Sequence, residues 1–448
     1  MKIYGKERDE IIDSIKSGKS RIAVYGLGKM GLPLAAVFAD HGANVIGVDI
    51  NEDVVNEINR GDCPIDEPGL KELVKRNVDG GRLKATTDAK EASRISDIVI
   101  ILIPLLIDDN NCPNIKIIKD VSQIISKGLE VGDFVILETT SPLGTTEDVI
   151  KPILEESGLK AGEEFGLAHC PERTYSGRVI KDLTQSYPKI VGGIDEKSTK
   201  TAEAVYSIIN KNGVIQVTNA RTAEAIKVFE GVYRDVNIAL ANELAMICEE
   251  FGIDAREAFD AANTQPYSHI HSPGIGVGGH CIPIYPYFLI KNAKKAALLQ
   301  AAREVNDSMP QHAVDIVSGS IEKVGKDLKN SKILVLGVTF RGGVKELTKS
   351  PAIEIMKILN LAGCEVYAYD PILSKEEIEK LGAEYKEDFK DIDCVIIGAD
   401  HEEFIGYDWE AIAKVMANPI VLDGRCVLDR EVMKGMGFIY QEIGNVVI

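Results

Sequence analysis

A single cysteine, Cys281, follows a run of glycines in the stretch GIGVGGHCIPIYPYF, residues 274–288. A thiolate is a strong nucleophile, so a reachable cysteine is suited to covalent catalysis. Glycine and proline disfavour regular helices and strands, and the stretch therefore predicts an irregular loop with little bulk around the sulfur. The alternative is a surface loop with an incidental thiol. We favour a nucleophile that a substrate approaches closely.

The seven other cysteines are scattered, with no CxxC pair and no Cys/His cluster at zinc spacing, so no metal is expected. The first 20 residues contain several acids and basic residues, unlike a signal or transit peptide. Reduced thiols and a cytoplasmic location are therefore expected.

A second candidate site lies near the N-terminus. An apolar strand at 21–26 runs into GLGKMG, then into a helical stretch at 32–42 and a second strand at 44–50. Glycines in GxGxxG register between a strand and a helix are typical of a dinucleotide site, because they permit a tight turn and the close approach of a pyrophosphate. The expected cofactor contacts come from Gly26, Gly28, Lys29, Met30 and Gly31.

Asp49 closes the second strand, 23 residues after Gly26. Its carboxylate would accept hydrogen bonds from an adenosine ribose and would repel a 2′-phosphate. No arginine follows it directly, so the sequence predicts NAD rather than NADP.

The rest of the chain must position these two sites. Further strands are expected at 97–104, 134–140 and 189–193, separated by helical stretches, which is typical of a doubly wound α/β sheet. An alanine-rich helical region covers 219–263 and suits a connector or a subunit contact. From Lys332 onward a second set alternates strands at 332–340, 364–371, 394–401 and 419–425 with a helix at 350–363.

We therefore predict an α/β chain in which two Rossmann-like doubly wound parallel-sheet domains are joined by a long-helix central domain. The predicted boundaries are 1–218 for the NAD-binding domain, 219–325 for the central domain and 326–448 for the last domain. In the last domain the glycine pattern has decayed to GVTFRGG, which favours a nucleotide ligand other than a dinucleotide.

Composition limits the partners. The 448 residues carry a net charge of −18, which argues against nucleic acid as a partner. The longest apolar run, 98–107, has ten residues, against the roughly 20 that a membrane-spanning helix needs.

Several motifs in order resemble the UDP-glucose/GDP-mannose dehydrogenase family over roughly residues 21–430. They are GLGKMGLP (26–33), ETTSPLGTT (138–146), CPERTYSGR (170–178), AEAIKVFEGVYRDVNIALANE (223–243), GVGGHCIP (276–283) and LDGR (422–425). The resemblance implies a four-electron oxidation of a UDP-sugar C6 hydroxymethyl group by NAD, through a cysteine thiohemiacetal and thioester, to a uronate for polysaccharide biosynthesis. GGHC and PER are similar to the branch that acts on UDP-N-acetylhexosamines, most of all UDP-N-acetyl-D-mannosamine; UDP-N-acetylglucosamine and UDP-glucose are the alternatives.

The resemblance also implies roles for single residues. Catalysis is expected from Cys281, Lys227, Glu172 and Thr140, with Thr140 also near the cofactor. Substrate contacts are expected from Arg173, Thr174, Lys227, Arg234, Gly278, Phe340 and Arg341. Lys227 and Arg234 are seven residues apart, so both can lie on one helix face. His280 is expected to be structural.

Some positions depart from the family pattern. Gly231 and Tyr285 stand where asparagine and aspartate are usual, Tyr267 and Thr348 where arginines are expected, and Leu105 where many relatives carry threonine. Lys227 and Cys281 are retained, so the two-step chemistry is still expected.

Two rival hypotheses are a one-step dehydrogenase of the β-hydroxyacid type, which leaves residues 274–448 unexplained, and a non-catalytic regulator that binds a nucleotide sugar. The apolar region 219–263 further predicts a homodimer or a higher homo-oligomer.

Overall fold

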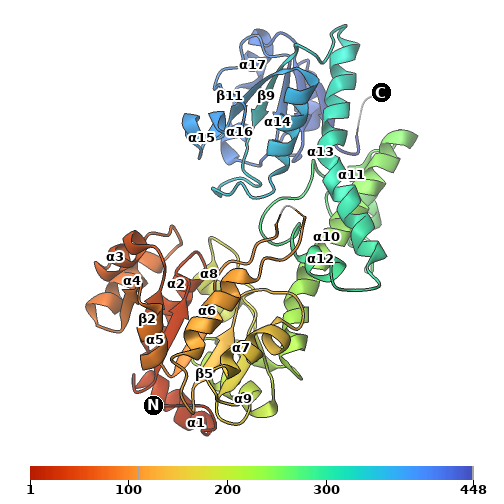
Figure 1. Ribbon diagram of the computed structural model, residues 1–448. Coiled ribbons are helices and arrows are strands. Elements are labelled where there is room, and N and C mark those ends of the chain that lie inside the picture. The colour runs from red at the N-terminus through yellow and green to blue at the C-terminus, as the bar shows by residue number, and fades with distance from the viewer. Residues whose placement is uncertain (109, 446–448) are drawn as a thin grey trace. The chain divides into compact units, whose positions relative to one another are not determined.

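The computed structural model describes residues 1–108 and 110–445 (Figure 1). The chain forms two compact units. The first unit contains residues 1–230 and 287–291, and the second contains 231–286 and the chain from Asn292 onward. The domain boundaries given above after residues 218 and 325 stay a prediction.

The first unit is built on a sheet whose strands are β1 (Arg21–Tyr25), β2 (Asn44–Val48), β3 (Leu83–Thr86), β4 (Ile98–Ile101), β5 (Phe134–Leu137), β6 (Gly166–His169), β7 (Lys189–Gly193) and β8 (Val214–Gln216). Among the described residues their order is β3-β2-β1-β4-β5-β6-β7-β8. β1 lies between β2 and β4 and pairs in parallel with both. The predicted doubly wound α/β fold is confirmed, and the glycine loop after β1 lies where the strand order reverses.

One strand pair in this sheet is not parallel. β6 and β7 run antiparallel, with Ala168 opposite Gly193, whereas the sequence predicted a parallel strand at 189–193. The connection between them holds only two short helical segments, at 179–181 and 182–186, and no long crossover helix to return the chain to the same edge. The short strands β3, β6 and β8 were not among the predicted strands.

Helices cover both faces of this sheet. Ile22 and Val24 of β1 belong to one apolar core with Leu32 of the following helix, while Ala23 and Tyr25 face a second core. The helices are α1 (Arg8–Lys16), α2 (Gly31–Asp40), α3 (Glu52–Asn59), α4 (Leu70–Asp79), α5 (Ala89–Ile95), α6 (Lys116–Ser126), α7 (Lys151–Glu155), α8 (Val179–Lys181) and α9 (Glu196–Tyr206), with short π-helical segments η1 (Thr145–Ile150) and η2 (Asp182–Ser186).

The predicted helical region 219–263 consists of two helices. α10 (Ala220–Phe251) starts in the first unit and continues into the second. It ends at Phe251, and the next residue, Gly252, has a φ of +66° that only glycine adopts readily. α11 (Ala255–Ala262) follows, and the Asp254 side chain caps it by accepting hydrogen bonds from two backbone N–H groups.

The second unit contains a parallel sheet with strands β9 (Lys332–Leu336), β10 (Glu365–Tyr369), β11 (Glu384–Tyr385), β12 (Cys394–Ile397), β13 (Ile420–Asp423) and β14 (Ile439–Glu442). Their order among described residues is β11-β10-β9-β12-β13-β14. Four of them were predicted; β11 and β14 were not. Its further helices are α13 (Ala297–Lys323), α14 (Pro351–Ala362), α15 (Lys375–Glu379), α16 (Glu402–Ile405), α17 (Trp409–Val415) and α18 (Arg430–Gly435). A short helix, α12 (Tyr285–Ile290), begins in the second unit and continues into residues 287–291 of the first.

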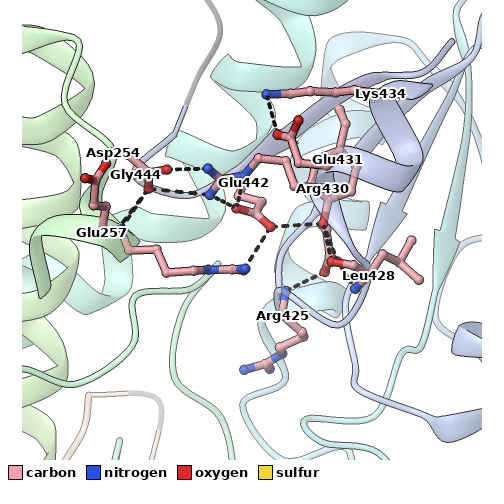
Figure 2. Close-up of polar contacts among 12 residues, drawn as sticks. Asp254, Glu257, Arg425, Leu428, Arg430, Glu431, Lys434, Glu442 and Gly444 are labelled. Atoms are coloured by element: carbon pink, nitrogen blue, oxygen red, sulfur yellow. Dashed lines mark hydrogen bonds and ion pairs between the residues drawn. The ribbon is translucent and has the colours of Figure 1, made fainter. Parts of the chain in front are cut away.

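Apolar packing joins the central helices to this sheet. Ala241 of α10 and Ala313 of α13 share one core with Ile333 and Val335 of β9. An ion-pair network also connects α11 to the C-terminal sheet (Figure 2). Arg430 forms an ion pair with Asp254, and its Nε lies 3.1 Å from Glu442 Oε2. The Gly444 carbonyl accepts a hydrogen bond from the first backbone N–H of α11. The helical stretch before the Cys281 loop is thereby fixed to the C-terminal sheet.

Candidate active site

The loop after β1 has the shape of a dinucleotide cradle. A Cβ on Gly26 would collide with the Leu102 carbonyl, and a Cβ on Gly31 would collide with the Gly26 carbonyl. The loop therefore packs this tightly only with glycine at both positions. A Cβ on Gly28, in contrast, would meet no heavy atom within 4 Å. The first and third glycines permit the turn, and the second leaves space for a ligand at the start of α2.

Asp49 follows β2 directly and is half-buried. Its Oδ2 accepts a hydrogen bond from the Leu27 N–H at 2.9 Å, and its Oδ1 accepts one from the Asn51 N–H at 3.0 Å. The carboxylate is thus held against the glycine loop. These residues fit NAD, as the sequence predicted. Lys29 and Met30 lie within the loop itself.

Thr140 and Glu172 lie after neighbouring strands of the same sheet. β5 and β6 pair in parallel with Leu137 opposite His169, so the residues that follow emerge at the carboxyl edge, as does the glycine loop. Glu172 accepts hydrogen bonds from the backbone and the hydroxyl of Thr174. The Thr174 hydroxyl also lies 3.0 Å from Met30 Sδ, which links this segment to the glycine loop.

A buried polar group that the sequence analysis missed stands two residues before Thr140. Glu138 is fully buried and accepts hydrogen bonds from Lys189 Nζ and Tyr206 Oη. Burial raises the pKa of Glu138, and the two donors oppose that rise. Thr139 Oγ1 donates to the Ile103 carbonyl at 2.9 Å and so fixes the end of β5 to the end of β4. A signal was present in the sequence, since consecutive polar residues directly after an apolar strand are costly to bury without partners.

Lys227 lies in the first part of α10 and is 6% exposed. The Nε of Arg173 lies 2.7 Å from Glu230, three residues further along this helix, and the Arg173 guanidinium stacks 5.0 Å from the Tyr187 ring centroid. The segment after β6 therefore lies beside the part of α10 that carries Lys227. Arg234 follows two turns later on α10 and belongs to the second unit.

In the second unit, Phe340 packs along the glycine run that precedes Cys281. A Cβ on Gly278 would lie 2.6 Å from Phe340 Cβ and 3.0 Å from the Lys349 carbonyl oxygen. Gly279 has a φ of +96°, and a Cβ there would contact the Phe340 ring at 3.3 Å. The glycines let the loop that carries Cys281 lie against the Phe340 ring. Three predicted site residues, Gly278, Cys281 and Phe340, therefore belong to two segments that pack together.

Arg341 extends this group. Its Cζ lies 5.5 Å from the Phe340 ring centroid, and its Nε is buried with no hydrogen-bond partner among the described residues. A buried guanidinium N–H without a protein partner is suited to an anionic ligand.

His280, next to Cys281, lies 2.8 Å from Glu346. Partial burial opposes ionisation of Glu346, but hydrogen bonds from Thr348 and the interaction with His280 outweigh it and lower the pKa of Glu346 to about 2. The contact fits the structural role expected of His280.

A second buried network holds the start of the Cys281 loop and was also missed. The Gly274 N–H donates to Asn242 Oδ1 at 2.9 Å, and Asn242 Nδ2 donates to Asn306 Oδ1 at 2.9 Å. Asn306 in turn donates to Asp235, which forms an ion pair with Arg303. Asp235 and Asn242 are seven residues apart on α10, so polar residues at two-turn spacing in an alanine-rich helix were the available signal.

Within residues 1–108 and 110–445, no helix has the length and apolar character needed to cross a bilayer. In the same residues, no group of three or more His, Cys, Asp and Glu side chains is arranged to hold a metal ion.

Three domains of a known family match the chain. Residues 20–210 match the NAD binding domain of the UDP-glucose/GDP-mannose dehydrogenase family, residues 221–308 its central domain, and residues 334–430 its UDP binding domain. These matches confirm the resemblance inferred from the motifs.

Similar proteins cover almost the whole chain. The UDP-N-acetyl-D-mannosamine dehydrogenase of Pyrococcus horikoshii is 38% identical over 95% of this chain and 99% of its own length. That of Methanocaldococcus jannaschii is 38% identical over 95% of this chain and 96% of its own length. The solved structure of the Pyrococcus horikoshii enzyme superposes with a TM-score of 0.86 at 36% identity, covering 96% of this chain and all of that one.

Proposed function

The chain belongs to the UDP-glucose/GDP-mannose dehydrogenase family of NAD-dependent enzymes, and we propose that its substrate is UDP-N-acetyl-D-mannosamine, whose C6 hydroxymethyl group it oxidises to a carboxylate. The observation that carries the proposal is Cys281 directly after a glycine run that packs against Phe340, in a chain similar over 95% of its length to enzymes of that name. A cytoplasmic location fits the cysteines, because all eight are free thiols, and free thiols are usual in the reducing cytoplasm.

The proposed reaction removes two hydrides from C6 without releasing the aldehyde. NAD, when bound, would supply the hydride acceptor for each oxidation, with a second NAD replacing the first NADH. The first oxidation also releases the proton of the C6 hydroxyl group. The Cys281 thiolate adds to the aldehyde carbon, and the resulting thiohemiacetal loses the second hydride to become a thioester. Water then adds to the thioester carbon, the C–S bond breaks, and the sulfur leaves as a thiolate with the electron pair.

The other predicted residues take supporting roles in this proposal. Lys227 stabilises the negative charge that develops on the C6 oxygen. Glu172 and Thr140 hold the water; both follow neighbouring parallel strands, β5 and β6. Arg173, Thr174 and Arg234 contact the sugar. Gly278, Phe340 and Arg341 hold the uridine diphosphate, with the unpartnered Arg341 Nε available to an anionic oxygen.

A panel of UDP-sugars assayed for NADH formation and product mass tests the proposed function. UDP-N-acetyl-D-mannosamine should give the highest kcat/KM and a product that has gained one oxygen and lost two hydrogens. A preference for UDP-N-acetylglucosamine or UDP-glucose would replace the sugar assignment. Tight binding of NAD and UDP-sugars without NADH formation would favour the non-catalytic regulator.

Replacing Asp49 with alanine should raise the KM for NAD about tenfold and narrow the preference for NAD over NADP. The change removes a charged hydrogen-bond acceptor, and such bonds contribute about 1.5–3 kcal/mol each. Initial rates with both cofactors measure the effect. Asp53→Ala, an exposed acid nearby on α3, is the matched control and should leave both values unchanged. Equal use of NAD and NADP by the wild type would contradict the assignment.

We also propose that the chain forms a homodimer or a larger homo-oligomer through α10. One face of this helix carries large apolar side chains that are 42–73% exposed, and they recur at four- and seven-residue spacing: Phe229, Tyr233, Leu240, Ile247 and Phe251. Light scattering at micromolar protein should give at least twice the 48.8 kDa chain mass. The double variant Leu240→Glu, Ile247→Glu should be monomeric. A monomeric wild type would contradict this assembly.

A further inference from the structure

Gly231 occupies an interior position of α10, where glycine destabilises a helix relative to alanine. Its backbone does not require glycine, because its φ is not positive. The reason for it lies in the neighbouring loop: a Cβ on Gly231 would lie 2.6 Å from Cδ2 and 3.4 Å from Cγ of Tyr285. The Tyr285 ring thus fills the space that any side chain at position 231 would take.

The ring packed in this space brings its hydroxyl to the candidate nucleophile. Tyr285 Oη lies 3.2 Å from Cys281 Sγ, within hydrogen-bond distance for a sulfur acceptor. Tyr285 is 8% exposed. A tight turn fixes the pair as well, because the N–H groups of Ile284 and Tyr285 both donate to the Cys281 carbonyl, at 3.1 and 2.9 Å. Helix packing and turn geometry therefore hold the O–H···S contact together.

We propose that Tyr285 is a catalytic residue that donates a hydrogen bond to Cys281 Sγ while the C–S bond forms and breaks. The inference rests on the proposed function in taking Cys281 as the nucleophile. A phenol is a weaker acid than a thiol, so Tyr285 keeps its proton while it stabilises the thiolate.

The same bond acts when the thioester is hydrolysed. Water adds to the carbonyl carbon and gives up a proton to Glu172, the carboxylate that holds this water in the proposed reaction. The C–S bond then breaks, and the electron pair remains on sulfur. The phenol O–H then stabilises the departing thiolate at the moment its charge develops. An aspartate, which the family pattern expects at 285, accepts hydrogen bonds when ionised and cannot supply this donor. The tyrosine at 285 therefore depends on the glycine at 231, which leaves room for its ring.

Tyr285→Phe tests the hydroxyl directly. The ring and its packing remain, so NAD binding and thermal stability should stay close to the wild type. kcat should fall about 10- to 100-fold, as expected for a lost hydrogen bond to a charged group. Rapid quenching and intact-mass measurement should show acyl-enzyme on Cys281 in the steady state, which a merely structural role would not produce. Wild-type kcat with no acyl-enzyme would overturn the proposal.

Gly231→Ala tests the packing that holds the hydroxyl in place. In the wild-type background the new methyl group pushes the ring away from Sγ, and kcat should fall as in Tyr285→Phe. In the Tyr285→Ala background the space is open, so the same change should raise Tm and leave kcat unaltered. Equal effects of Gly231→Ala in both backgrounds would overturn the coupling.

Failure of this proposal differs from failure of the proposed function. If the wild type forms NADH and Tyr285→Phe matches it, only the Tyr285 role is wrong. If the wild type forms no NADH from any UDP-sugar, the proposed function is wrong. Alkylation of Cys281 by iodoacetamide then tests the hydrogen bond from Tyr285 to Cys281 by itself. A pH profile of alkylation moved to higher pH in Tyr285→Phe supports the hydrogen bond, and an unchanged profile overturns it.

Discussion

Replacing Lys227 with alanine should abolish both oxidation steps while leaving NAD binding intact. Lys227 lies on α10 beside the segment that carries Glu172 and Arg173, and Arg173 is paired with Glu230 one turn away. Its ammonium group would stabilise the C6 oxyanion, and removing one such charge-assisted contact should lower kcat by about 10²- to 10³-fold. Steady-state NADH formation measures the loss, and NAD titration measures the retained binding.

Arg221→Ala is the matched control for Lys227→Ala. Arg221 lies on the same helix and forms an exposed ion pair with Asp148 at 2.9 Å, so its loss removes a cation without touching the proposed site. It should keep the wild-type kcat. A Lys227→Ala variant within tenfold of the wild type would show that this lysine has no catalytic role.

Replacing Cys281 with serine should stop steady turnover in a different way. A serine can still lie beside the sugar, but an ester forms and hydrolyses less readily than a thioester. The variant should release at most a burst of one or two NADH per site and then stall with bound aldehyde or a stable acyl-enzyme. Cys63→Ser, at a partly buried thiol whose pKa is raised by burial, is the control and should turn over normally. Steady turnover of Cys281→Ser at the wild-type rate would contradict the thioester route.

Chemical labelling tests the role of Cys281 as nucleophile without a substitution. Iodoacetamide should abolish turnover, and bound UDP-sugar should slow the loss. Peptide mapping should find Cys281 labelled in step with inactivation. The fully buried Cys170 and Cys394 should stay unlabelled, because burial raises the pKa of both thiols.

The sequence predicted the fold best where strong local patterns coincide. The strand, glycine turn and helix at β1 and α2 were predicted because the glycines, the apolar run and Asp49 all indicate one βαβ unit. The strands β3, β6 and β8 have three or four residues each and too little alternation to be recognised. The break in the predicted helix at Gly252 depends on a positive φ, which composition alone does not reveal.

The candidate site could be proposed from the sequence where its residues lie in compact motifs. Gly26, Asp49, Lys227 and Cys281 each stand in such a motif. The groups that support them do not, because Glu138 pairs with Lys189 and Asn242 with Asn306, and each pair joins residues more than 50 positions apart. Tyr285 and Cys281 are only four residues apart, yet their contact depends on the packing of the Tyr285 ring against Gly231 of another helix.

The ratio of NADH formed to UDP-N-acetyl-D-mannosamine consumed tests the central claim most directly. The oxidation of an alcohol to an acid on one cysteine removes two hydrides, so limiting sugar with excess NAD should yield two NADH per sugar and a uronate product. One NADH per sugar, with an aldehyde or ketone as the product, would contradict the thioester route and favour a one-step dehydrogenase.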